Sequence, residues 1–584
     1  MVNKVNENQE SLEQDFPLRS PDVVMDINRL GSMHQSRLSF MRQLMRRVMR
    51  EQWQIDAAIT DLDEHGYGTK VYTIKTPNHI YSHVIFSDYL ADEDRNDRVI
   101  AEKWDVTMAL CIGTVSSEQL EIMRRNVPKQ EAGRASSNMM VLSRGNKSSR
   151  NFNYVVDELA AGRQPQKSAL AKVGYLYRTT AVYGSGKFGL ADWAKVKQQC
   201  PEFASPFAAE MFCCYMLRHF SIQQAEHLAR IKAPKKAVAL ADDIKRFIGI
   251  GNSTGLGMAP YLIRHPKLIS QWILTREKAL ARVINRGAVN KNSCARLGQV
   301  LDKAILHIQE TTVPDEIQIK RNQVLEQELS MLLKYLQQDL PSNWHNLVAK
   351  AEQKFSLETQ EMLNSALLEV HPELVDGYAQ YESVDEQYIA QPNMSLQGFL
   401  ALIEQHYRWA LSYDFSQQDA NHYFWYRSEE KMEPRIGERF NEPGQEREMP
   451  LTIARLVREC YDSVIDYCAN KKTNNITTAK FLIDNPAMAS IVKRIQSMSQ
   501  ECYGEIRGNL ADIEMRPLDL LRCKLSFFGV SKFDPKSKLW VRNTMFQGAP
   551  VISDIGQTFA DDWYFPVAGS ASSADELSNA SITE

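Results

Sequence analysis

The spacing of apolar residues changes about a quarter of the way along the chain, and this change sets the fold class. Residues 69–75 and 79–89 are β-branched and aromatic runs separated by a short turn, and residues 104–115 resemble them, which is typical of neighbouring strands. From residue 150 onward the apolar positions recur at three and four residues, as they do in helices. We therefore expect an α+β, predominantly α-helical protein with a small N-terminal antiparallel β-sheet followed by a large helical body.

The 584 residues allow several folded regions. Residues 1–20 and 569–584 are polar and without periodicity, so we expect them to be disordered tails. Between the tails we expect a small α+β region over 21–150, a helical region with Gly-rich loops over 151–375, and a mainly helical C-terminal region over 393–568. An acidic, Tyr-rich run that ends at Pro392 is the expected boundary before the last of these.

Two amphipathic helices stand out. Residues 37–53 combine an apolar stripe with five arginines, among them Arg42, Arg46 and Arg47. Residues 316–338 carry one leucine stripe, which predicts a long helix that packs against others. That stripe consists of Leu325, Leu329, Leu332 and Leu336.

Charge and cysteine content indicate the cellular setting. The 69 basic and 72 acidic residues give a formal charge of −3, so no overall field attracts nucleic acid or membrane. The nine cysteines include no CxxC pair, and no apolar stretch has the length of a membrane span. We therefore expect a cytoplasmic protein without a membrane partner, in which binding of nucleic acid is not favoured.

A first Gly-rich segment follows a strand-like run. Gly184, Gly186 and Gly189 match the spacing G-x-G-x-x-G, with Lys187 between them. The amides of such a turn and the start of a following helix can bind an anion. The string GSGKFG resembles the glycine loop of protein kinases, but neither HRD nor DFG follows it, and no dinucleotide-binding pattern follows either. A simple turn before a helix is the structural alternative.

A second Gly-rich segment covers residues 249–266. Its amides and hydroxyls are candidate anion ligands, and these residues are Gly251, Asn252, Ser253, Thr254 and Gly255. The spacing G-x-S-x-G also makes Ser253 a candidate nucleophile of a serine hydrolase, with the preceding IKRFIGI as a short strand. Helical periodicity around the motif argues against a hydrolase core. A loop that permits close helix packing is the structural alternative.

The run from Trp425 to Arg435 places aromatic side chains beside alternating charge, which suits the rim of a pocket. The cations expected to hold an anion there are Arg427, Lys431 and Arg435, and the expected proton acceptors are Glu429, Glu430 and Glu433. A solvated loop with ion pairs is the structural alternative.

Metal sites are not expected. His79 and His83 lie four residues apart in a predicted strand, which separates them by about 13 Å and prevents them from sharing one ion. HExxH is absent, and no Cys and His cluster has zinc spacing. We expect no structural zinc and find no haem or iron–sulfur motif, so the cofactor is left open.

These features together predict an enzyme that binds a small anionic molecule, phosphorylated or of nucleotide type, through its Gly-rich loops. The reaction type is left open. The competing hypothesis is a helical binding or scaffold protein that docks nucleic acid or a protein through its Arg-rich helix, and a serine hydrolase is the third. Self-association into a homo-oligomer is compatible with each. The enzyme hypothesis requires Lys187, Ser253 and Arg427 to surround one hollow.

Overall fold

The structure is a computed structural model. It describes residues 16–91, 104–129, 138–179, 199–252, 266–378, 390–416, 425–427, 434–436, 446–447, 451–471, 476–506, 522–535 and 541–568. Of the two predicted tails, residues 1–15 and 569–584 lie outside these ranges. Residues 16–20 are described and belong to the folded part, because Arg19 forms ion pairs with Glu277 and Glu361.

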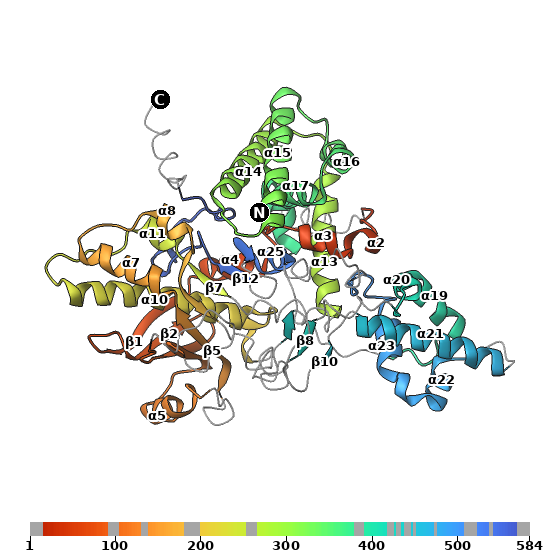
Figure 1. Ribbon diagram of the computed structural model, residues 1–584, viewed down its shortest axis with the longest axis horizontal. Coiled ribbons are helices and arrows are strands. Elements are labelled where there is room, and N and C mark those ends of the chain that lie inside the picture. Colours follow the sequence, from red (N-terminus) through yellow and green to blue (C-terminus); the bar gives the residue numbers. More distant parts are fainter. Residues whose placement is uncertain are drawn as a thin grey trace, which may run out of the picture.

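A nine-stranded sheet forms one side of the molecule (Figure 1). Its neighbouring strands pair antiparallel, apart from β6 and β7, which pair in parallel. In spatial order the strands are β1 (Gln54–Leu62), β2 (Gly68–Lys75), β3 (Ile80–Ser87), β4 (Val106–Ile112), β5 (Met139–Lys147), β6 (Tyr175–Thr179), β7 (Gly249–Asn252), β12 (Val541–Met545) and β11 (Lys532–Pro535). A separate small sheet contains β10 (Glu446–Arg447), β8 (Trp425–Arg427) and β9 (Pro434–Ile436).

Alternate side chains of the central strands enter two different apolar cores. Tyr72 and Ile85 belong to the large core that also contains the helix α10 (Ala208–Lys232). Val71 and Val84 point to the other face, where they join Met123 of the helix α5 (Ser117–Asn126). The two-residue period in the sequence therefore reflects two covered faces.

Helices cover the sheet and continue beyond it. The helix α10 is buried on nearly all sides over its first half, which explains why apolar residues surround it there. The others on this side are α7 (Ser149–Ala160), α8 (Lys167–Ala171) and α11 (Asp242–Phe247). The short turns of 3₁₀ helix are Pro201–Phe203, Asp376–Tyr378, Pro486–Met488 and Ile552–Asp554.

A second group of helices has its own apolar core. It consists of α13 (Pro266–Ile284), α14 (Lys291–Glu310), α15 (Glu316–Gln338), α16 (Trp344–Lys354), α17 (Leu357–Val370) and α18 (Pro372–Val375). The helix α15 has the predicted bounds, and its four stripe leucines are buried as expected. Of the N-terminal helices, α4 (Phe40–Arg50) lies between this group and the sheet, whereas α2 (Pro21–Val24) and α3 (Ile27–Ser32) lie beside the group on its other side (Figure 1).

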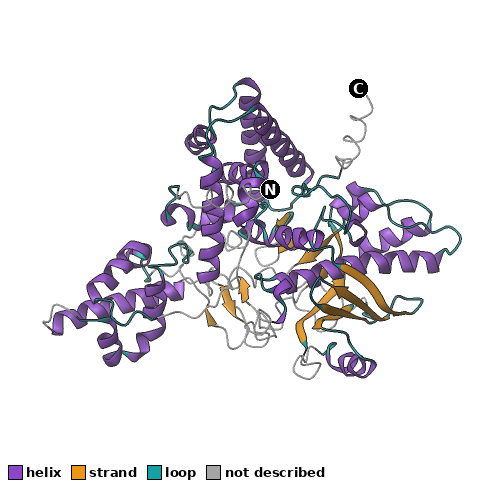
Figure 2. Ribbon diagram, turned by 180° about the vertical axis from the view of Figure 1, so that it is seen from behind, coloured by secondary structure: helices purple, strands orange, loops and turns teal. Residues whose placement is uncertain are grey.

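A third group of helices forms a lobe at the side away from the sheet (Figure 2). It consists of α19 (Leu396–His406), α20 (Arg408–Ser412), α21 (Leu451–Lys471), α22 (Thr478–Asp484) and α23 (Ala489–Ser497). One further short helix, α25 (Lys524–Phe528), packs against α4 near the centre. The fold is thus the predicted mixture of α and β, dominated by helices.

The sheet is larger than its N-terminal strands suggested. The strands β11 and β12 come from the end of the chain and extend the sheet beyond β7. The strand β1 has exposed or half-exposed side chains throughout and so lacks the apolar alternation that marks a strand. The predicted strand IKRFIGI is wrong in its first part, because residues 242–247 form the helix α11 and the strand β7 starts at Gly249.

In the ranges that the structure describes, none of the helices combines the length and the apolar character that crossing a membrane requires.

Candidate functional site

Most of the residues proposed from sequence motifs fall outside the described ranges. They are Gly184, Gly186, Lys187, Gly189, Ser253, Thr254, Gly255, Glu429, Glu430, Lys431 and Glu433. The backbones of Arg427 and Arg435 are described and lie on the paired strands β8 and β9. Whether all these residues share a hollow therefore stays a prediction.

The two Gly-rich segments nevertheless begin from one place in the fold. The strands β6 and β7 run parallel, with Thr179 opposite Asn252, and both strands end at these residues. Residues 180 and 253 therefore continue from neighbouring points on the same edge of the sheet. In open α/β sheets this edge, beyond the carboxyl ends of parallel strands, is where ligands bind.

Gly251 has a packing role that its motif did not reveal. It lies inside β7 rather than in a loop, and a Cβ atom added there would lie 2.6 Å from the ring of Tyr175. Asn252, the last residue of β7, is buried. Position 251 therefore requires glycine because the Tyr175 ring leaves no space for a Cβ atom, independently of any ligand beyond the strand.

The Arg-rich helix is amphipathic, as predicted, but Arg42 faces inward rather than toward the solvent. Arg42 is 0% exposed, donates from Nε to Asp561 over 2.9 Å and contacts Glu369 over 3.1 Å. Its guanidinium carbon also lies 5.4 Å from the rings of Trp563 and Tyr564, so the charge is enclosed by acids and aromatic faces. Burial among these groups leaves Arg42 no contact with a partner molecule.

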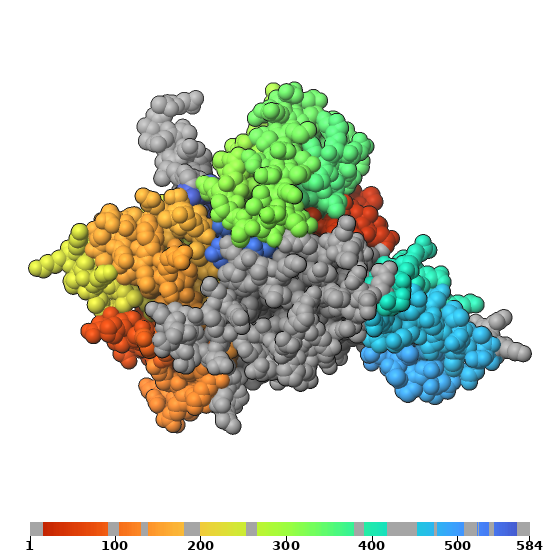
Figure 3. Space-filling model, in the orientation of Figure 1, coloured from red at the N-terminus to blue at the C-terminus, as the bar shows by residue number. Residues whose placement is uncertain are grey.

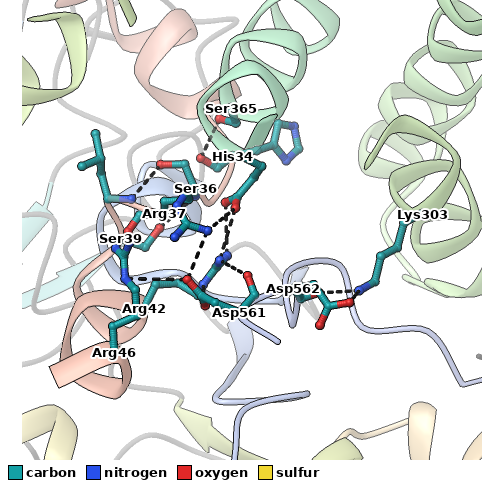
Figure 4. A network of polar contacts seen from close by, with 12 residues as sticks. His34, Ser36, Arg37, Ser39, Arg42, Arg46, Lys303, Ser365, Asp561 and Asp562 are labelled. Carbon is teal, nitrogen blue, oxygen red and sulfur yellow. Dashed lines mark hydrogen bonds and ion pairs between the residues drawn. The ribbon is translucent and has the colours of Figure 1, made fainter. Parts of the chain in front are cut away.

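Neighbouring arginines join the same cluster. Arg37 pairs with Asp376 over 2.8 Å, and Arg46 contacts Asp376 and Asp561; Figure 4 shows Arg37, Arg42 and Arg46 converging from one side. Arg47 donates to the backbone oxygens of residues 201 and 202. Arg37, Arg42 and Arg46 are thus engaged in ion pairs within the fold, whereas Arg50 at the end of the helix is exposed, and binding of nucleic acid by this helix stays a prediction.

The helix α17 supplies Glu369, which contacts Arg42, and further buried acids that meet other arginines. Nearly all of it is buried, and one stripe is polar at spacings of three and four residues. The stripe consists of Glu358, Glu361, Ser365 and Glu369. Glu361 alone accepts from Arg19, Arg29 and Arg276 at 2.7 to 2.9 Å, and these cations hold the pKa of its carboxyl far below the usual range despite burial.

A small polar cavity opens at the start of α17, where six parts of the chain meet. We call it the His34 pocket. Its polar lining residues are His34 and Gln35 after α3, His307 and Thr311 at the end of α14, Gln318 and Asn322 on α15, Glu358 on α17, Arg522 before α25, and Ser531 and Lys532 at the start of β11. The cavity volume is about 60 Å³, which is room for several water molecules or one small ligand group rather than for a whole nucleotide.

Two lining groups have polar atoms without a hydrogen-bond partner. Arg522 is 3% exposed, and one of its terminal nitrogens pairs with Glu358 while its Nε–H has no acceptor in the described part of the chain. The Nε2 atom of His34 is buried, lies 3.7 Å from Glu358 and also lacks a hydrogen bond. Both atoms line the cavity and can form a hydrogen bond with a group bound there.

The opposite wall holds a second histidine and a lysine. His307 has Nδ1 at 2.8 Å from the carbonyl oxygen of Pro566 and Nε2 at 2.8 Å from that of Ser531. Lys532 is buried and donates to the carbonyl oxygen of Ala171 over 2.6 Å. The imidazole therefore ties the C-terminal segment to β11, and both strand and segment form this wall.

The electrostatics of the pocket favour an anion. Burial, with the nearby charge of Arg522, lowers the pKa of His34 to about 4, and burial also lowers the pKa of His307. His34 is then neutral at pH 7. The charged side chains that line the cavity are Arg522, which pairs with Glu358, and Lys532.

Sequence motifs did not point to this pocket. Its polar residues come from six places between positions 34 and 532, and none of them lies in a recognisable spacing. One weak signal was available: Glu358, Glu361 and Glu369 lie among apolar residues of one helical segment, and acids that become buried must find cations. Their partners, however, lie hundreds of residues away along the chain.

Within the described ranges, no group of three His, Cys, Asp or Glu side chains is placed to hold a metal ion. Comparisons of the chain with protein-family models, with curated proteins and with solved structures found no match.

Proposed function

We propose that the protein binds a small anion, a carboxylate or phosphate group, in the His34 pocket. The observation that carries this proposal is the buried Nε–H of Arg522, which lines the cavity without an acceptor. A guanidinium with a free donor is well suited to a planar or tetrahedral oxyanion. The second cation in the lining, Lys532, and the neutral His34 support the same ligand class.

We extend the proposal to an enzyme that acts on a small anionic molecule. The carboxylate of Glu358 and the Nε2 atom of His34 lie 3.7 Å apart beside the cavity, which gives an acceptor and a potential donor of a proton next to a bound group. The small volume indicates that the anionic group enters and the rest of the substrate stays outside. The reaction type is left open.

Thermal denaturation at constant ionic strength tests the anion site, with inorganic phosphate as the probe. A ligand at a hundred times its dissociation constant stabilises the native state by about 2.7 kcal/mol, so phosphate should raise the melting temperature. The double variant Arg522→Gln with Glu358→Gln removes the cation and its carboxylate together, so no buried charge is left unpaired. We expect this variant to lose the response to phosphate.

Arg50→Gln is the matched control, because the Arg50 side chain is 75% exposed and does not line the pocket. This variant should respond to phosphate as the wild type does. An unchanged response in the double variant would place the anion elsewhere. Absence of any response in the wild type, for phosphate, sulfate and acetate alike, would refute the proposal.

The sheet edge beyond β6 and β7 is a second candidate for the same ligand class. The observation that favours it is the parallel pairing of Thr179 with Asn252, from which both Gly-rich segments continue. Here the anion would meet the amides around Lys187 and Ser253, and a nucleophilic Ser253 is the corresponding hydrolase proposal. If Gly186→Val and Ser253→Val abolish the response to phosphate while the Arg522 and Glu358 double variant retains it, this edge is the site.

A further inference from the structure

One face of the helix α15 carries apolar side chains that nothing in the described structure covers. Ile317, Val324 and Met331 are exposed by 46%, 43% and 59% of their surface. The buried leucines of α15 lie on a different face, packed into the core of the helical group. Isolated apolar residues on a surface are ordinary, but a row of them along one helix marks an interaction site.

The three residues are spaced by seven. Seven residues complete two turns of a helix to within about 20°, so the side chains form one straight row on the surface. This is the spacing at which two helices stay in contact along their length. Figure 3 shows that the lobe with α14 and α15 projects from the rest of the molecule, which leaves room for a second helix beside it.

We propose that this row, the α15 stripe, is the contact through which two copies of the chain associate, with their α15 helices antiparallel. In such a pair a two-fold axis passes through Val324. Residue n of one copy then faces residue 648 − n of the other copy. Val324 then faces its own copy, and Ile317 faces Met331 of the other chain. A symmetric contact requires this self-complementarity, and the stripe has it.

The charges beside the stripe select the antiparallel orientation. In the antiparallel pair Lys320 faces Glu328 of the other copy, so opposite charges meet on both sides of the axis. The Glu328 carboxylate also accepts hydrogen bonds from Ser356, at 2.6 Å from its hydroxyl, and is thereby held in place. In a parallel pair Lys320 and Lys334 would each face themselves, which is unfavourable.

Contact through so few side chains buries less surface than a stable interface of about 800 Å² per partner. We therefore expect a weak dimer whose population rises with protein concentration. A helix of an unrelated protein could also bind such a stripe. In that case the purified chain would be monomeric at every concentration.

Cysteine cross-linking of the full-length protein tests the register. Val324→Cys lies on the axis and should form an intermolecular disulfide under mild oxidation. Ile317→Cys and Met331→Cys should each cross-link poorly alone and efficiently when the two variants are mixed. Wild-type protein treated in the same way is the background, because Cys468 and Cys502 are half-exposed.

Sedimentation of Met331→Glu supplies an independent measurement. This variant should remain monomeric at concentrations where the wild type associates, while Ile483→Glu, at a still more exposed position on α22, should associate as the wild type does. Efficient cross-linking of Ile317→Cys or Met331→Cys alone, or a wild type that is monomeric at all concentrations, would overturn the proposal.

Discussion

Gly251 shows how one residue serves the fold inside a motif that suggests binding. Its Cα lies against the ring of Tyr175, on the strand next to its own, and a methyl group there would approach the ring carbons to 2.6 Å. Real Cβ atoms do not come so close, so the ring or the strand would have to move. The same strand leads directly to Ser253, which explains why a packing glycine and a candidate ligand residue appear in one string.

We expect Gly251→Ala to destabilise the protein by about 1–3 kcal/mol, the usual cost of overpacking. The same substitution in a Tyr175→Ala background should cost much less, because the ring has been removed. Urea denaturation measures both differences.

Gly298→Ala is the control for this experiment. Gly298 lies inside α14, where an added Cβ meets only Leu333 at an ordinary 3.6 Å. Alanine favours a helix over glycine by about 1 kcal/mol, so this variant should be as stable as the wild type or more stable. If Gly251→Ala lowered the free energy of unfolding equally in the wild type and in the Tyr175→Ala background, a clash with the Tyr175 ring could not be the cause.

Among the elements, α17 has the most unusual composition for its position. A helix with every side chain of its middle buried would ordinarily be apolar on all faces, yet α17 keeps an acidic stripe. Each acid of the stripe meets a different set of arginines: Glu358 meets Arg522, Glu361 meets three arginines, and Glu369 meets Arg42. The stripe thus selects which segments pack on the helix.

We expect Glu361→Gln to lower the free energy of unfolding by about 3–5 kcal/mol, because removing one partner leaves buried cations uncompensated. Glu352→Gln, on the exposed face of α16, should change the stability little. Chemical denaturation of both variants makes the comparison. If Glu361→Gln were as stable as Glu352→Gln, the arginines around Glu361 would have to find other acceptors.

At the scale of the whole molecule, ion pairs join the beginning of the chain to its middle and its end. Arg42 contacts both Glu369 and Asp561, which are 327 and 519 residues away along the chain. Arg19 and Arg29 reach Glu361 in the same way. The N-terminal segment of residues 16–50 therefore acts as a strap between the helical group and the C-terminal segment, and Figure 4 shows part of this junction.

Acid should weaken this strap. The neighbouring arginines hold the pKa values of Glu361, Asp376 and Asp561 below their ordinary values of 4.5 and 3.8. Carboxyls with lowered pKa values stabilise the fold fully above the unfolded values, and this contribution is lost as the pH falls through the folded ones. Burial raises the pKa of Glu369, so protonation of this one carboxyl favours the folded state. The three carboxyls with lowered pKa values outnumber it.

We therefore expect the strap to open first when the pH falls below about 4. Hydrogen exchange of residues 16–50 should accelerate there before exchange in α10, which is held by apolar contacts that do not titrate. Simultaneous acceleration of exchange in both regions would contradict a separate role for the ion pairs.

Much of the local structure could be predicted from the sequence. The strands β2, β3 and β4, the capping box of Ser116 and Gln119, and the bounds of α15 all follow from contacts within a few residues or from a regular period. The α+β class follows from the same periodicity. The strand β1 was not predictable in this way, because an exposed edge strand has no apolar alternation.

The His34 pocket and the direction of the Arg37–Arg50 side chains were decided by tertiary structure alone. A sequence shows that an arginine is charged, but whether it faces water or Glu369 depends on segments hundreds of residues away. Likewise, no local spacing brings His34, His307 and Arg522 together; packing of three helices against β11 does. Short-range periodicity therefore determined the elements of this protein, and long-range charge pairing determined how they meet, because burying a charge is tolerated only beside its opposite.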